Sequence, residues 1–170
     1  SAHTGITLMS DGHQAASCLF CKMVAGEIPY HEVWSSPTHL AFLTIFPNTK
    51  GVTVVIPKAH QGSYIFEQTD TVIAELMIAA KQTAQALDAF FPDCGRCGVV
   101  FEGFGVDHLH AKVYPLHGTK IKNWKPIESG NGNMQYFETY PGYVSSHDSH
   151  RADDAELAEL ATQIRQSPAK

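Results

Sequence analysis

The sequence lacks an apolar run of membrane-spanning length and any block of Lys or Arg residues. A bilayer-spanning helix needs about 20 consecutive apolar residues, so we expect no membrane association. Lys and Arg together number 12 against 17 Asp and Glu, which gives a formal net charge of −5. Because nucleic-acid binders carry a clustered basic surface, nucleic acid is not an expected partner.

Cysteine is also scarce, and its four residues form two Cys-x-x-Cys pairs, Cys18/Cys21 and Cys94/Cys97. Residues 1–16 are polar and lack the apolar core of a secretory signal. Outside a secreted chain, Cys-x-x-Cys favours metal or redox chemistry over a structural disulfide. We therefore expect a cytoplasmic protein whose residues 1–15 form a flexible arm.

The 170 residues suffice for one domain with a substantial core. Strands are predicted over residues 31–34, 39–45, 52–56, 98–101 and 108–114, a short helix over 18–26 and a terminal helix over 153–166. A long helix opens at Thr69–Asp70 and ends near Pro92. Its apolar face is Val72, Ile73, Leu76, Ala80, Ala84 and Leu87. Short connections predict that the first three strands form an antiparallel meander.

The last predicted strand carries a row of basic side chains. Alternation along a strand puts His108, His110 and Lys112 on one face. Such a row suits an enzyme that handles phosphate, because it offers a nucleophile, a second imidazole and a fixed positive charge. The alternative is that His108 and His110 are merely two half-exposed histidines, and the row alone does not decide between these interpretations.

Several further motifs occur in a fixed order. They are Cys18-Leu19-Phe20-Cys21-Lys22, Gly26-Glu27-Ile28-Pro29, Leu40-Ala41-Phe42, Val55-Ile56-Pro57-Lys58-Ala59-His60 and His108-Leu109-His110. In order and spacing they resemble the histidine triad (HIT) superfamily. The resemblance covers a HIT domain at residues 16–118 and leaves 119–170 as a C-terminal extension, which we expect to pack on the domain or on a partner subunit.

The resemblance implies an α+β fold: a five-stranded antiparallel sheet with one long helix and a short N-terminal helix, usually in a homodimer. It also implies a nucleotide substrate, no organic cofactor and reaction at the α-phosphate through a nucleotidyl-histidine intermediate. The implied catalytic residues are His110 as nucleophile, with His108 and Lys112 beside it. Neutral imidazole can attack without an added base, since its ordinary pKa is about 6.5.

Apolar residues at matching positions would line a base pocket, namely Leu19, Phe20, Met23, Phe42 and Ile45. For each of them ordinary core packing is the alternative. Thr44 occupies the position where the family often has an acidic residue that bonds the ribose. Gly105 belongs to a glycine-containing loop that lets backbone approach a ligand closely.

The resemblance further implies a structural zinc ion held by Cys18, Cys21, His60 and His108, a chemically sensible closed tetrahedral set. Two alternatives stay open from the cysteine spacing alone. Cys18 and Cys21 could join Cys94 and Cys97 in a zinc site of four cysteines, or Cys94 and Cys97 could be reduced thiols or a redox pair.

Three departures from the family pattern bear on catalysis. The third histidine is replaced by Lys112, the acidic ribose ligand by Thr44, and the segment before His108 is apolar at Phe104-Gly105-Val106. A lysine can neutralise phosphate but does not reproduce a histidine's proton transfer. The resemblance as a whole predicts a nucleotide hydrolase or nucleotidyltransferase. The three departures favour the alternative, a nucleotide-binding regulatory module with little or no catalysis.

Overall fold

The computed structural model describes residues 17–125 and Ala155. The expected N-terminal arm (1–15) lies outside this part of the chain. The predicted terminal helix at 153–166 also lies outside it, apart from Ala155. The same holds for most of the C-terminal extension, from residue 126 onward. No helix among the described residues is long and apolar enough to cross a membrane.

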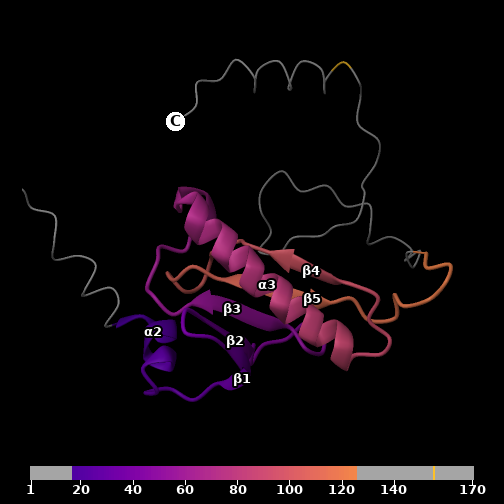
Figure 1. Cartoon of the computed structure of the whole chain (residues 1–170), viewed down its shortest axis with the longest axis horizontal. Coiled ribbons are helices and arrows are strands. Elements are labelled where there is room, and N and C mark those ends of the chain that lie inside the picture. The colour runs from indigo at the N-terminus through magenta and orange to yellow at the C-terminus, as the bar shows by residue number, and fades with distance from the viewer. Residues whose placement is uncertain (1–16, 126–154, 156–170) are drawn as a thin grey trace, which may run out of the picture. The chain divides into compact units, whose positions relative to one another are not determined.

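Five strands form one antiparallel sheet in the order β1-β2-β3-β5-β4 (Figure 1). The strands are β1 (His31–Ser35), β2 (His39–Leu43), β3 (Thr53–Pro57), β4 (Cys97–Val100) and β5 (Ala111–Pro115). The first three strands pair consecutively, which confirms the predicted meander. Together with the helices, the sheet makes the α+β fold that the sequence predicts.

The helices are α2 (Leu19–Val24), a short 3-10 turn η1 (Ile65–Glu67) and α3 (Asp70–Phe90). α3 begins where predicted because the side-chain oxygen of Thr69 accepts a hydrogen bond from the Val72 amide, an N-cap interaction. Figure 1 shows α3 lying across the strands. Its buried face includes Leu76, Ala80 and Leu87, as the helical spacing predicts.

The two faces of the sheet carry separate apolar clusters. Residues of α3 pack with Val55, Leu109 and Ala111 on one face. On the other face, Phe20 of α2 packs with Phe42 and neighbouring strand residues. Because Leu109 and Ala111 point toward α3, the histidines that alternate with them point toward α2.

The strand that carries the basic row begins later than predicted, at Ala111 instead of His108. Pairing of β3 with β5 stops at Val55↔Ala111, and Pro57, two residues further along β3, has no N–H to extend a ladder. The Leu109 amide instead donates to the carbonyl of Gln61, in the loop after β3, at 2.9 Å. His108 and His110 therefore lie before the strand, on a segment that bends at His108 and leads into β5.

Candidate active site

The two histidines of His108-Leu109-His110 are both buried, with 0% and 4% of their surfaces exposed. The interpretation of a half-exposed pair is therefore wrong. The Phe20 ring from α2 meets both imidazoles edge-on, with centroid distances of 5.7 Å to His108 and 5.6 Å to His110. This shared contact places both side chains on the α2 side of the sheet.

His110 is held in one tautomer. Its Nδ1 lies 2.7 Å from the carbonyl oxygen of His108, and a carbonyl can only accept, so Nδ1 carries the hydrogen. Nε2 is then the nitrogen with a free lone pair. Burial lowers the pKa of His110, with a smaller contribution in the same direction from the positive charge of Lys112. The ring is therefore neutral at pH 7, the form a nucleophile requires.

His108 adopts the opposite tautomer. Its Nε2 lies 2.8 Å from the carbonyl oxygen of Pro57 and donates to it. The lone pair of Nδ1 therefore faces the thiols of Cys18 and Cys21, at 3.4 and 3.5 Å. Burial lowers the pKa of His108 and keeps the ring neutral. A histidine metal ligand commonly donates its second ring nitrogen to a carbonyl in this way.

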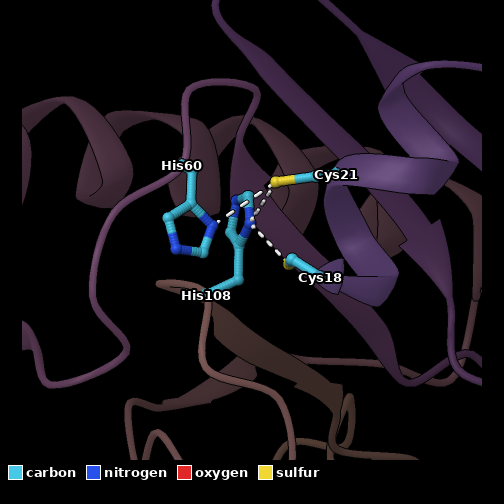
Figure 2. Close-up of side chains that lie close together, drawn as sticks. All are labelled: Cys18, Cys21, His60 and His108. Atoms are coloured by element: carbon cyan, nitrogen blue, oxygen red, sulfur yellow. Dashed lines mark hydrogen bonds between the residues drawn. The ribbon is translucent and has the colours of Figure 1, made fainter. Parts of the chain in front are cut away.

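Figure 2 shows Cys18, Cys21, His60 and His108 converging from α2, the loop after β3 and the segment before β5. Their ligand atoms all lie within 4.8 Å of one another, and the Cys21 thiol lies 3.4 Å from Nδ1 of His60. Tetrahedral zinc bonds of about 2.3 Å to sulfur and 2.0–2.1 Å to nitrogen imply sulfur–nitrogen separations of about 3.6 Å. The three sulfur–nitrogen distances are close to that value, so the donor set fits a metal ion.

The loops that carry His60 and His108 are tied together by Asp107, which the sequence analysis did not single out. Its Oδ1 accepts a hydrogen bond from the Ser63 amide at 3.1 Å. Gly103 approaches the same loop so closely that a Cβ there would lie 2.7 Å from the Ser63 carbonyl oxygen, and its φ is +73°. In the sequence, its position immediately before His108 is the feature that could have marked Asp107 as part of the site.

The alternative of a four-cysteine zinc site is wrong, because the two Cys-x-x-Cys pairs lie in different clusters. Cys18 belongs to the apolar cluster on the α2 side of the sheet, and Cys94 to the one on the α3 side. In the part of the chain that the structure describes, Cys94 and Cys97 instead gather with Asp88.

Lys112 shares the α2 side of the sheet with the histidines, since it pairs with Val54 of the α2-side cluster. Its Nζ donates to Oε1 of Glu102 at 2.9 Å, with 31% and 19% of the two side chains exposed. Glu102 is a partner that the sequence analysis did not identify. The positive charge that we expected to serve phosphate is thus already engaged by a carboxylate.

The predicted nucleotide-binding residues fall into four groups. Phe20 and Phe42 are buried and pack together, with ring centroids 5.5 Å apart, and Met23 packs against them. The amide of Thr44 bonds to Val52, and its hydroxyl accepts from the Phe46 amide at 3.2 Å. Ile45 is 71% exposed. Leu19 and Gly105 line a cavity instead.

This cavity, of about 410 Å³, lies between the start of α2 and the loop before His108. Its lining is Ser17, Cys18, Leu19, Gly105, Val106 and Asp107. Gly105 has φ +91°, a conformation that favours glycine. The cavity is lined by Cys18, one of the predicted metal ligands, and by Asp107, which immediately precedes His108.

Comparison with known proteins agrees with this geometry. Residues 25–119 match the HIT domain. The protein named hit from Bacillus subtilis is 36% identical over 110 residues, which cover 62% of this chain and 75% of that protein. An adenosine 5′-monophosphoramidase from Schizosaccharomyces pombe is 34% identical over 103 residues, covering 58% and 74%.

Solved structures show the same fold. The crystal structure of a HIT family member from Bacillus subtilis matches with a TM-score of 0.61 and 26% identity, covering 91% of this chain and 99% of that one. The chain belongs to the HIT family, as its motifs predicted.

Proposed function

We propose that this protein is a nucleotide hydrolase or nucleotidyltransferase that acts at the α-phosphate through a nucleotidyl intermediate on His110. The observation that carries the proposal is the 2.7 Å bond from Nδ1 of His110 to the His108 carbonyl. It leaves Nε2 as the nucleophilic nitrogen of a buried, neutral ring. The phosphoramidase activity of the fission-yeast relative supports the same class of substrate, a nucleoside phosphate conjugate.

In the first step, the lone pair of Nε2 attacks the α-phosphorus. A nitrogen–phosphorus bond forms as the bond from phosphorus to the leaving group breaks, and the leaving group departs with that electron pair and takes up a proton from solvent. Water then attacks phosphorus and loses a proton to solvent, while the nitrogen–phosphorus bond breaks and its electron pair returns to Nε2, which releases the nucleoside monophosphate. An acceptor other than water would give transfer instead of hydrolysis. The His108 carbonyl balances the positive charge that His110 acquires in the intermediate.

His108 acts in this scheme as a positioning residue and a metal ligand. Zinc held by Cys18, Cys21, His60 and His108 would supply structural cross-linking of α2 to the two loops. The neutral Nδ1 of His108, fixed by the Pro57 carbonyl, supports this role. Leu19 and Gly105, at the cavity, are the predicted nucleotide-binding residues that this geometry favours most. For the other five candidates, contact with the nucleotide stays a prediction; they are Phe20, Met23, Phe42, Thr44 and Ile45.

The test is intact-protein mass spectrometry after incubation with adenosine 5′-phosphoramidate, and separately with a panel of nucleoside diphosphate compounds. Wild type should show an acid-labile nucleotidyl adduct or released product. His110→Ala should show neither while still binding AMP. Exposed His31 is the matched control, and His31→Ala should behave as wild type.

A regulatory nucleotide-binding module is the second candidate function. The Lys112–Glu102 pair favours it, because the cation that replaces the third histidine is engaged by a carboxylate. The same experiment separates the two proposals. Nucleotide binding without adduct or product from any compound in the panel would reject the enzyme and leave the module.

The proposal includes a cytoplasmic homodimer. The sheet ends at β1 and β4, and an edge strand offers unpaired backbone groups to a second chain. The four described cysteines are unpaired, in keeping with a reducing compartment. Sedimentation equilibrium tests the dimer, and a monomer at micromolar concentration would reject it.

A further inference from the structure

A second group of metal-ligating side chains lies away from the candidate active site. It consists of Asp88, Cys94 and Cys97, whose ligand atoms all lie within 4.8 Å of one another. Both thiols point at the same atom, Oδ1 of Asp88, from 3.4 Å for Cys94 and 3.3 Å for Cys97. We propose that these three residues form a second zinc site, which fastens the end of α3 to the start of β4.

The donor chemistry selects the ion. Thiolates are soft ligands that Ca²⁺ and Mg²⁺, which take oxygen ligands, do not favour. An iron–sulfur cluster commonly requires four cysteines, and the described residues supply two here. Zinc accepts both thiolate and carboxylate, with bonds of about 2.3 and 2.0–2.2 Å, so a sulfur–oxygen separation of about 3.6 Å is expected. The observed 3.3 and 3.4 Å are close to that value.

The position of Asp88 supplies an independent argument. Asp88 lies in the last turn of α3, where the helix dipole disfavours an anion and favours a cation. No basic residue lies in that turn, and among the described residues no ion pair to Asp88 is formed. Among residues 17–125, no basic side chain compensates this carboxylate beside its two thiols, and a bound divalent cation would do so.

The loop that carries the thiols is held in place without the metal. The Cys94 amide bonds to the Phe91 carbonyl at 3.0 Å, and the Gly95 amide to the Thr119 hydroxyl at 2.9 Å. A Cβ on Gly95 would lie 2.8 Å from the Thr119 carbonyl oxygen, so this close approach needs glycine. Cys94 is 2% exposed, whereas Asp88 and Cys97 are half-buried and leave a route for the ion.

Binding would form two zinc–sulfur bonds as the two thiol protons leave to solvent, with no change of oxidation state. The carboxylate completes three protein ligands, and water takes the fourth position of a tetrahedral ion. The site is separate from the set at His108, because the two Cys-x-x-Cys pairs lie in different clusters on opposite faces of the sheet. Its metal content is therefore measurable independently of the proposed reaction.

The experiment counts zinc in the reduced full chain by native mass spectrometry, with affinities from competition against a chromophoric chelator. Wild type should bind two ions. Asp88→Asn and Cys97→Ser should each bind one, or bind the second at least about tenfold more weakly. Asp70→Asn, an exposed aspartate at the other end of the same helix, is the matched control and should bind two.

Both test positions are half-buried, so circular dichroism should show a folded chain in each variant. Co²⁺ is a second probe, since its thiolate charge-transfer absorption should fall in Cys97→Ser. The proposal is overturned if Asp88→Asn and Cys97→Ser bind as many ions with the same affinity as wild type, whatever the number of ions that wild type binds. A Cys94–Cys97 disulfide that persists in reductant and excludes metal would also overturn it.

Discussion

Replacing Glu102 tests whether Lys112 takes over a phosphate-binding role from the missing third histidine. At 2.9 Å and an effective dielectric constant of about 20, the direct attraction between the two charges is about 6 kcal/mol. Desolvation and side-chain ordering offset most of it, so the net stabilisation of such a partly exposed pair is about 0.2–1 kcal/mol. A nucleotide that recruits Lys112 must first release it from Glu102 at roughly this cost.

Glu102→Gln removes that cost and should tighten AMP binding by about 1.4- to fivefold, the equivalent of about 0.2–1 kcal/mol. Loss of a nearby negative charge alone would also favour a phosphate, so the measurement needs a double-mutant cycle. Isothermal titration calorimetry with AMP should show that Lys112→Ala weakens binding more in the Glu102→Gln background than in wild type. Exposed Glu67 provides the charge-matched control, Glu67→Gln, which should leave the affinity unchanged.

The reasoning is refuted if Lys112→Ala has the same effect on AMP affinity in both backgrounds. Lys112 would then be a structural partner of Glu102 that does not reach the phosphate. Stabilisation of the negative charge on the phosphoryl oxygens in the transition state would depend on backbone N–H groups. An unchanged AMP affinity in Glu102→Gln would refute it equally, because neither the released lysine nor the removed carboxylate would then be near the ligand.

Two further predictions concern stability. A metal ion present at about 100 times its Kd adds about 2.7 kcal/mol to the free energy of unfolding. Chelation should therefore lower the calorimetric Tm by roughly 5 °C or more. His60→Ala should reduce that shift in Tm, and the control His31→Ala should leave it unchanged. A Tm that does not change on addition of chelator contradicts the metal sites. The Lys50 carbonyl, and then the Asp93 carboxylate, raise the pKa of His117 above 6.5. Its contribution to the free energy of unfolding is therefore present below that pH and lost as pH rises through the raised pKa. The difference from His117→Gln in urea titrations should shrink with rising pH, and a pH-independent difference contradicts the assignment.

The fold was predictable because its signals are local and periodic. The apolar face of α3 repeats at helical spacing around Leu76, and Thr69 supplies the capping oxygen. The start of β5 was mispredicted, since alternation continues from His108 into the strand while the pairing does not. What ends the ladder is Pro57 on a different strand and the bond from Leu109 to the Gln61 carbonyl, and neither is visible in the residues of β5 themselves.

Side-chain partners distant in sequence were the least predictable part of the site. The cysteine spacing identified two metal-like pairs but not which residues complete them. Asp88 lies six residues before Cys94 on a helix, and its involvement depends on where α3 ends relative to β4. The engagement of Lys112 by Glu102 likewise depends on the path of the loop between β4 and His108, which no periodicity describes.

The hydrogen bonds of the two histidines connect the metal set to the proposed nucleophile. The Pro57 carbonyl fixes the His108 ring so that Nδ1 faces the thiols, and the His108 carbonyl fixes the His110 ring so that Nε2 stays free. In the proposed function, one residue would therefore offer its side chain to the metal and its backbone to the nucleophile. An ion that immobilises the His108 ring also restrains the carbonyl that orients His110. Such orientation is a recognised source of rate acceleration, so the proposed structural metal would contribute to the proposed reaction without contacting the substrate.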